Sequence, residues 1–447
     1  MGLLDQVGRL VYQLSMAKLT DEDWEAKAFE AGQLYSPAAP IDERDLFAGR
    51  SEQVDKMLEA VNERGKHAVL FGERGVGKTS LAKVFSSMFP RTLRRILAVR
   101  EQVDPSDDFS SIWRKVFKDL HVRPIGEDDT QLAPLAREYP GVIQPDDVRR
   151  EFQELFPSNV IPIIVIDEFD KARESTDKKI HELMANTIKH LSDYSINATI
   201  ILVGVADDIN DLIGEHPSIT RCIEQIPMPR MNDSELRQIL DKRAQRLGMK
   251  FHGDAYFKIV ELARGLPSYA HLLGLYSTQN AIGRRSLQII ETDVDAAIAR
   301  ALEKSQESTQ ADYNSAIHSN RTDSLHRQVL LACALAKPDS RGQFAPTAVI
   351  GPLSDILKRP VTIANFQQHL QMFTTEERSN ILVRKGKERA YKYRFRDPMM
   401  QPYVIMRGID ERLIPPSSLS VLSTPVEPLL PIEFAQPLKQ SPDDVQH

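Results

Sequence analysis

The chain has 447 residues and a formal net charge of −6, with 41% hydrophobic and 27% charged residues. This composition is typical of folded domains, and the length suggests two to four of them. The negative net charge excludes a general attraction to nucleic acid, so any such contact needs a local cationic patch. No apolar run is long enough to span a membrane, and the N-terminus lacks a secretory signal. We therefore expect a cytoplasmic protein without a membrane partner.

Residues 1–40 are predicted to form an N-terminal helical extension. Apolar residues recur at helical spacing between positions 2 and 16, and a Pro-rich segment follows at 36–40. Two interpretations stay open for this helix. It packs on the body of the same chain, or residues 1–35 bind a partner protein or a second copy.

Residues 71–80 read FGERGVGKTS and lie between an apolar run, 67–71, and a predicted helix that starts near Leu81. A strand, a glycine-rich loop, Lys-Thr and a helix form the context of a phosphate-binding P-loop. Glycines let backbone N–H groups surround the phosphates, and the helix N-terminus favours negative charge. The predicted nucleotide-binding residues are Gly72, Glu73, Arg74, Gly75, Val76, Gly77, Lys78, Thr79 and Ser80. Within this set, Lys78 would reach the terminal phosphates and Thr79 would ligate Mg²⁺.

A second apolar run, 163–166, ends in Asp167 and Glu168. The pattern predicts a buried strand that delivers two carboxylates to its carboxyl end, which after a P-loop is a Walker B element. Asp167 would hold Mg²⁺ through water, and Glu168 would orient and polarise the attacking water. The alternative is a strand end with two solvated acids.

Further strands alternate with helices up to residue 229. The run 198–205 ends at Asp207, and Arg221 precedes a short strand at 223–226. This alternation predicts an α/β fold with a doubly wound, mostly parallel sheet over residues 41–229. Ligands of such sheets bind at the carboxyl ends of the strands, where Asp167, Glu168 and Asp207 fall.

The rest of the chain is predicted to be mainly helical. Residues 230–303 form a helical lid, 304–322 a polar linker, 323–410 a winged-helix domain and 411–447 a Pro/Ser-rich tail. The winged helix is predicted from three helices, the third at 362–373, and a hairpin made by 380–383 and 391–395.

The predicted hairpin is strongly cationic. Between residues 384 and 396 only Glu388 opposes seven basic residues, namely Arg384, Lys385, Lys387, Arg389, Lys392, Arg394 and Arg396. A local cationic ribbon on an acidic protein suits phosphate contacts, so we predict that this hairpin binds DNA. The alternatives are a solvated hairpin or a docking surface for an acidic partner.

The order of these motifs resembles an AAA+ ATPase of the origin-recognition and initiator-like group over about residues 41–408. Transposition-assisting ATPases and, at the margin, the signalling STAND ATPases are relatives. The resemblance implies that Gly49 and Arg50, in the sequence Phe47-Ala48-Gly49-Arg50, lie near the adenine base. It places Asp207 at the sensor-1 position, where Asn is more usual, and Arg221 at the position of an arginine finger that completes a neighbour's site.

The resemblance also bears on the lid. The usual sensor-2 arginine is absent, since Ser268 stands there, and the Gly-Leu-Pro form resembles STAND lids in which the proline, here Pro267, lies near the nucleotide. The expected cofactors are ATP and Mg²⁺, and the expected activity is slow ATP hydrolysis. We expect a switch that forms homo-oligomers with ATP and binds DNA through the winged helix. The alternative is a STAND-like signalling or antiphage-defence ATPase whose C-terminal domain binds a protein.

Overall fold

The computed structural model describes most of the chain outside the two ends. The described residues are 19–37, 49–89, 96–122, 133–134, 139, 141–155, 161–174, 179–214, 217–319, 324–339, 341–387 and 390–414. The predicted helix at 2–16 and the tail lie outside them. No helix among these residues is long and apolar enough to cross a membrane.

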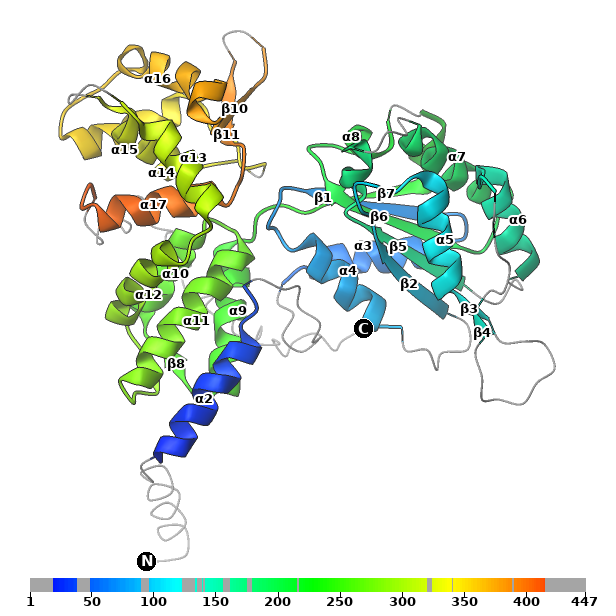
Figure 1. Ribbon diagram of the computed structural model, residues 1–447, viewed down its shortest axis with the longest axis horizontal. Helices are drawn as coiled ribbons and strands as arrows, with labels where there is room; N and C mark the ends of the chain where they lie inside the picture. Colours follow the sequence, from blue (N-terminus) through cyan, green and yellow to red (C-terminus); the bar gives the residue numbers. More distant parts are fainter. Residues whose placement is uncertain are drawn as a thin grey trace, which may run out of the picture.

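A five-stranded parallel sheet forms the centre of the first lobe (Figure 1). Its order is β2 (Ile96–Gln102), β5 (Ile161–Asp167), β6 (Thr199–Val205), β1 (His67–Gly72) and β7 (Ile223–Pro227). The inner strands are apolar runs buried on both faces, as parallel sheets require. The doubly wound α/β fold predicted from the sequence is confirmed.

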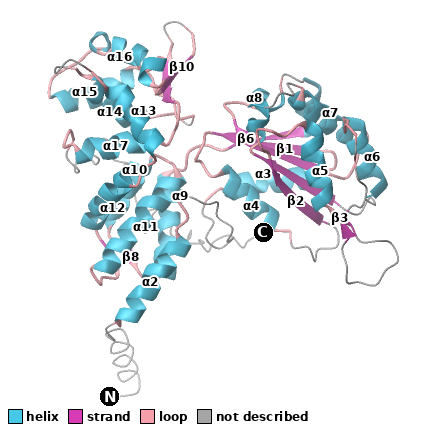
Figure 2. Cartoon of the chain, in the orientation of Figure 1, coloured by secondary structure: helices cyan, strands magenta, loops and turns pink. Residues whose placement is uncertain are grey.

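Helices cover both faces of this sheet (Figure 2). One face packs with α3 (Ser51–Asn62) and α4 (Lys78–Ser87) in a core that continues into the rest of the chain. The other face packs with α5 (Phe109–Asp119), α6 (Pro145–Leu155) and α7 (Ile180–Asp193) in a separate core around the fully buried Trp113. The short β3 (His121–Val122), β4 (Ala133–Pro134) and α8 (Asn210–Ile213) complete the lobe.

The second lobe begins with the predicted helical lid. It contains α9 (Asp233–Arg246), α10 (Gly253–Ala263), α11 (Pro267–Gly283) and α12 (Glu291–Glu303), with short β8 (Lys250–Phe251) and β9 (Gln288–Ile289). Helix α9 begins at Asn232, which forms a capping box with Glu235. The N-terminal helix α2 (Asp21–Leu34) packs against α11. The buried Tyr35 accepts a hydrogen bond from Thr278 of that helix at 3.3 Å, so this part of the N-terminal extension packs on its own chain.

The C-terminal unit carries the predicted helices and hairpin. It contains α13 (Glu307–Ile317), α14 (His326–Leu335), α15 (Thr347–Leu357), α16 (Gln367–Met372), β10 (Leu382–Lys385), β11 (Lys392–Phe395) and α17 (Met400–Asp410). Strands β10 and β11 pair antiparallel, as expected. The assignment of this unit as a winged helix, like the domain boundaries, stays a prediction.

Two local expectations in this unit were wrong. The third helix is interrupted, because Thr362 and Asn365 bond reciprocally around a 3₁₀ turn and Phe366 then leaves helical backbone geometry. Helix α16 is therefore short. The stretch 304–322, predicted as a linker, contains α13, which is held by burial of Tyr313 against Tyr403 of α17. Polar composition concealed this helix, since few of its residues are buried.

Candidate nucleotide site

The loop between β1 and α4 has the backbone of a phosphate cradle. Gly75 and Gly77 have φ values of 84° and 95°, a region that favours glycine. A Cβ atom on Gly72 would lie 2.5 Å from the Met228 carbonyl oxygen, so no side chain fits there. Helix α4 starts at Lys78, which directs its N-terminus at the loop.

Lys78 is buried within this loop. Its Nζ donates to the backbone carbonyl oxygens of Gly72 at 3.1 Å and Glu73 at 2.8 Å. Burial lowers the pKa of Lys78 to about 8, although Asp170, Asp167 and Glu73 act to raise it. An anionic phosphate would stabilise the charged form, so the site fits a nucleotide polyphosphate.

The two predicted magnesium residues lie side by side. Thr79 Oγ1 donates to Asp167 Oδ1 at 3.4 Å, and Asp167 is almost completely buried at the end of β5. No group of three or more His, Cys, Asp or Glu residues suited to a metal occurs in the part of the chain that the structure describes. A hydroxyl and one carboxylate fit Mg²⁺, which prefers oxygen ligands and takes the rest from water and phosphates.

Glu168 follows Asp167 and has a left-handed backbone conformation, with φ of 56°. Its Oε2 accepts hydrogen bonds from Lys171 and from Gln102 of β2. Burial alone would raise the pKa of Glu168, but the bonds from Lys171 and Gln102 outweigh it and hold the pKa below the usual value. Glu168 is therefore an ionised carboxylate at neutral pH, which a general base requires.

Residues 73–80, Asp167 and Glu168 line one cavity of about 1030 Å³, together with residues of the lid and the C-terminal unit. The predicted residue Gly72 is not among its lining residues. The cavity includes Pro267 as expected, and it includes Arg50. The Arg50 guanidinium donates to the carbonyl oxygens of Val76 at 3.1 Å and Pro229 at 2.7 Å, so it ties the P-loop to the start of the lid. Gly49 packs against Glu235 instead of lining the cavity, since a Cβ atom on it would lie 2.6 Å from that carboxylate.

Asp207 lines the cavity beyond β6, and the cationic hairpin reaches it. Arg394 of β11 forms an ion pair with its Oδ1, and Lys385 of β10 lies 3.1 Å from its Oδ2. The expected repulsion between Asp207 and a phosphate is thus offset by two cations of the same chain. Asp207 and the hairpin lie far apart in sequence, and the tertiary structure brings them together.

Other cations of the hairpin also face the protein. Lys392 pairs with Asp339 at 2.8 Å, and Arg396 lies 3.5 Å from Asp312. The Arg384 guanidinium stacks over the Tyr391 ring at 4.5 Å, while Arg389 lies outside the described residues. Arg394 faces the ATPase core, where it pairs with Asp207.

Arg221 lies away from this cavity within its own chain. Its side chain is 77% exposed and pairs with Asp193 of α7 at 2.9 Å. The exposed guanidinium is accessible to a neighbouring subunit, and its role as an arginine finger there stays a prediction.

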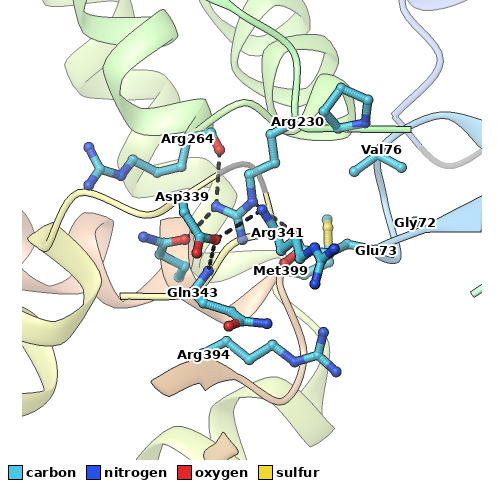
Figure 3. Close-up of polar contacts among 12 residues, drawn as sticks. Gly72, Glu73, Val76, Arg230, Arg264, Asp339, Arg341, Gln343, Arg394 and Met399 are labelled. Atoms are coloured by element: carbon cyan, nitrogen blue, oxygen red, sulfur yellow. Dashed lines mark hydrogen bonds and ion pairs between the residues drawn. The ribbon is translucent and has the colours of Figure 1, made fainter. Parts of the chain in front are cut away.

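Sequence reasoning missed a second junction, centred on Arg230 (Figure 3). This arginine follows β7, and its Nε donates to the P-loop Glu73 at 2.8 Å. Its Nη1 donates to Gln401 Oε1 of α17 at 2.6 Å and to the Arg264 carbonyl oxygen of the lid at 3.1 Å. Gly342 packs so closely that a Cβ atom there would overlap the Glu73 carboxylate. The only local sign of this junction in the sequence is the glycine at position 342, whose φ of 70° favours that residue type.

Comparison with known proteins gives a family and several structural likenesses. The family model Novel STAND NTPase 1 matches residues 40–348. No curated protein matches the chain. Similar structures include the Aeropyrum pernix ORC1 protein in complex with DNA, at 15% identity and TM-score 0.43, covering 85% of this chain and 97% of that one.

Two further structures are similar at the same level. A Walker-type ATPase of Pyrococcus abyssi has 18% identity and TM-score 0.47, covering 83% of this chain and 99% of that one. The Thermotoga maritima RuvB Holliday junction branch migration motor has 15% identity and TM-score 0.39, covering 78% and 94%. The family match spans well over half of the sequence and includes the P-loop, the Walker B strand and the lid. The chain is a P-loop NTPase and belongs to the Novel STAND NTPase 1 family.

Proposed function

We propose that this protein is an ATP-binding, slowly hydrolysing switch whose C-terminal unit reports the state of the nucleotide site. One observation carries the proposal: Arg394 and Lys385 of the hairpin pair with Asp207 inside the nucleotide cavity. A cation that neutralises an acid at this edge of the sheet responds to the arrival of phosphate charge. The hairpin is therefore an element that nucleotide can hold or release.

The proposed chemistry follows from the residues of the cavity. Lys78 and the loop amides bind the β- and γ-phosphates, and Mg²⁺ is held by Thr79 and, through water, by Asp167. The bound ion would supply positive charge that neutralises the phosphates. Glu168 orients the attacking water and accepts its proton. The lid carries Ser268 at the position where the resemblance expects an arginine, which supports slow turnover.

Two more contacts join the C-terminal unit to the nucleotide site. The Arg230 junction connects α17 to the P-loop residue Glu73. In the lid, Tyr269 donates to the Met399 carbonyl oxygen at 2.8 Å, and the hydroxyl of Ser268 contacts the Met399 sulfur at 3.4 Å. Movement of the P-loop or lid would therefore be transmitted directly to the C-terminal unit.

The test compares two double variants of the C-terminal unit. Lys385→Ala with Arg394→Ala removes both cationic partners of Asp207, whereas Arg359→Ala with Lys387→Ala removes equal charge from the C-terminal unit and leaves the Arg384–Tyr391 contact of the hairpin intact. Partly exposed pairs contribute up to about 1 kcal/mol each. We expect the first double variant to speed amide hydrogen exchange across β10 and β11 by about tenfold, and the control to change it little.

The nucleotide dependence of the same readout completes the test. Wild-type protein with Mg²⁺ and a non-hydrolysable ATP analogue should show hairpin exchange that differs from the ADP form. Identical exchange in the ATP, ADP and nucleotide-free forms, with no effect of Lys385→Ala and Arg394→Ala, would contradict the switch.

A second candidate function is DNA binding by the hairpin, favoured by its seven basic residues against one acid. In the docked arrangement Lys385, Lys392, Arg394 and Arg396 face carboxylates of the same chain. DNA would have to compete with those carboxylates, so this function belongs to an undocked hairpin. An ATP-dependent homo-oligomer with Arg221 in trans is compatible with either candidate. The alternative of a protein partner, bound through residues 1–35 or through the C-terminal unit, is also retained.

A further inference from the structure

Arg100 binds one oxygen of Asp167, the carboxylate that is expected to hold Mg²⁺. It lies on β2 beside β5, where Arg100 is in register with Val165. Its Nη2 donates to Asp167 Oδ2 at 2.7 Å, and the side chains are 24% and 1% exposed respectively. A guanidinium therefore compensates the charge of the buried Asp167 at its Oδ2 atom.

The other oxygen of Asp167 is also occupied by protein groups. Asp167 Oδ1 accepts the Thr79 hydroxyl at 3.4 Å and the backbone N–H of Glu168 at 2.9 Å. A buried carboxylate without partners would be strongly unfavourable, and here every oxygen has one. Each oxygen of Asp167 thus has a hydrogen-bond partner within the chain itself.

We propose that Arg100 is a built-in counter-ion of Asp167 that competes with Mg²⁺ for this carboxylate. The proposal rests on the proposed function, in that the cavity binds ATP. While Arg100 is paired, nucleotide binds without metal, and Mg²⁺ engages Asp167 when the guanidinium leaves. The P-loop would then retain nucleotide in a metal-poor, non-hydrolysing state, which deepens the expectation of a slow switch.

Electrostatic repulsion indicates that Arg100 competes with Mg²⁺ for Asp167, and does not merely orient Asp167 for the ion. A divalent ion and a guanidinium on one buried carboxylate repel each other, and low solvent exposure leaves that repulsion poorly screened. Among the described residues, the bond to Asp167 is the one hydrogen bond of the Arg100 guanidinium, and its Nε is buried without a partner. Loss of this one hydrogen bond leaves the guanidinium with longer-range attraction to Glu168 and Glu101.

The experiment measures binding of AMP-PNP in EDTA and in saturating Mg²⁺, by calorimetry, for wild type, Arg100→Met and Arg100→Lys. In wild type the two affinities should differ by less than about tenfold. Arg100→Met should raise that ratio by about tenfold, because binding weakens in EDTA when Asp167 loses its counter-ion. It should also lower the Mg²⁺ concentration for half-maximal effect by about tenfold, a change of about 1.4 kcal/mol. Arg100→Lys, which keeps the charge, should resemble wild type.

Arg114→Met is the matched control, because the Arg114 guanidinium donates to the carbonyl oxygens of Tyr139 and Gly141 instead of to Asp167. Weaker Mg²⁺ binding in Arg100→Met would show that Arg100 orients Asp167 and would overturn the proposal, as would an unchanged ratio. A wild-type affinity more than about a hundredfold weaker in EDTA would overturn it without any variant. Absence of AMP-PNP binding under both conditions would overturn the proposed function as well, whereas a failed docking test would leave this inference intact.

Discussion

The P-loop and the cationic hairpin are both short segments with a clear sequence pattern, yet they differ in what fixes their role. In residues 71–80, loop glycines, Lys78 and the helix start are all neighbours in sequence, and their geometry follows from local backbone rules. In β10 and β11 the strands were predictable, but the partners of the cations lie far away in sequence, at Asp207, Asp312 and Asp339.

The difference teaches that charge pattern alone does not identify a ligand. A cationic ribbon has the same sequence whether it faces phosphate or a carboxylate of its own chain. Phosphate sites such as the P-loop require backbone N–H groups, and those are specified by glycine and by a helix N-terminus. Variants that act within the P-loop and Walker B region should therefore behave as the sequence predicts. Variants of basic residues whose carboxylate partners lie far away in sequence test the contacts seen in the structure.

The largest expected effect concerns Arg221, which is predicted to act in the nucleotide site of a neighbouring subunit. An arginine finger in trans contributes about 10³-fold or more to turnover, so Arg221→Ala should bind ATP normally and hydrolyse it at least about 10³-fold more slowly. Steady-state phosphate release and equilibrium ATP binding separate the two effects. Arg64→Ala is a suitable control, since Arg64 bonds the Ser195 carbonyl oxygen away from the cavity.

Subunit mixing sharpens this prediction. An Arg221→Ala subunit keeps its own Glu168 and lacks only the arginine that it lends to a neighbour. Mixed with Glu168→Gln subunits, it should recover part of the lost activity. A wild-type rate independent of protein concentration, with no recovery on mixing, would make Arg221 a surface partner of Asp193 only.

Glu168→Gln tests the local side of the comparison. The amide keeps the size of the side chain and removes the base, which typically contributes about 10²- to 10⁴-fold. ATP affinity should change little, because the phosphate-binding groups are untouched. A pre-steady-state and steady-state phosphate assay measures the loss, and turnover at the wild-type rate would remove Glu168 from the mechanism.

The parallel sheet, P-loop, Walker B acids and lid were predictable because each depends on apolar periodicity or on a motif within a few turns of chain. The Thr79–Asp167 contact followed as well, since parallel strands end at one edge. The ion pairs Arg100–Asp167 and Arg230–Glu73 could not be predicted, because an arginine in or after a strand has many possible partners. Helix α13 was missed because its burial depends on contact between Tyr313 and Tyr403 of α17, which lies far away in sequence.

The pKa of Lys78 gives a smaller, pH-dependent effect. The free site has a Lys78 pKa of about 8, and bound phosphate raises that pKa by stabilising the charged form. ATP affinity is therefore complete below pH 8 and falls as pH rises through this value, by at most tenfold per pH unit. Titration calorimetry from pH 7 to 9.5 should detect proton uptake on binding. Lys78→Arg should lose the dependence, since arginine stays charged.

The smallest expected effect separates the two candidate roles of the hairpin. Lys387 lies at the turn, beyond the pairs with Asp207, so Lys387→Ala should leave hairpin docking unchanged. If duplex DNA is the ligand, the loss of one phosphate contact should flatten the slope of log K against log salt by about 0.9. Lys385→Ala should produce the same change in slope and loosen docking as well, because it contacts Asp207. Fluorescence anisotropy with a labelled duplex across a salt series measures both, with Lys337→Ala as a cation control outside the hairpin. No duplex binding at low salt, with or without ATP, would leave the hairpin with its carboxylate partners alone and favour the signalling ATPase.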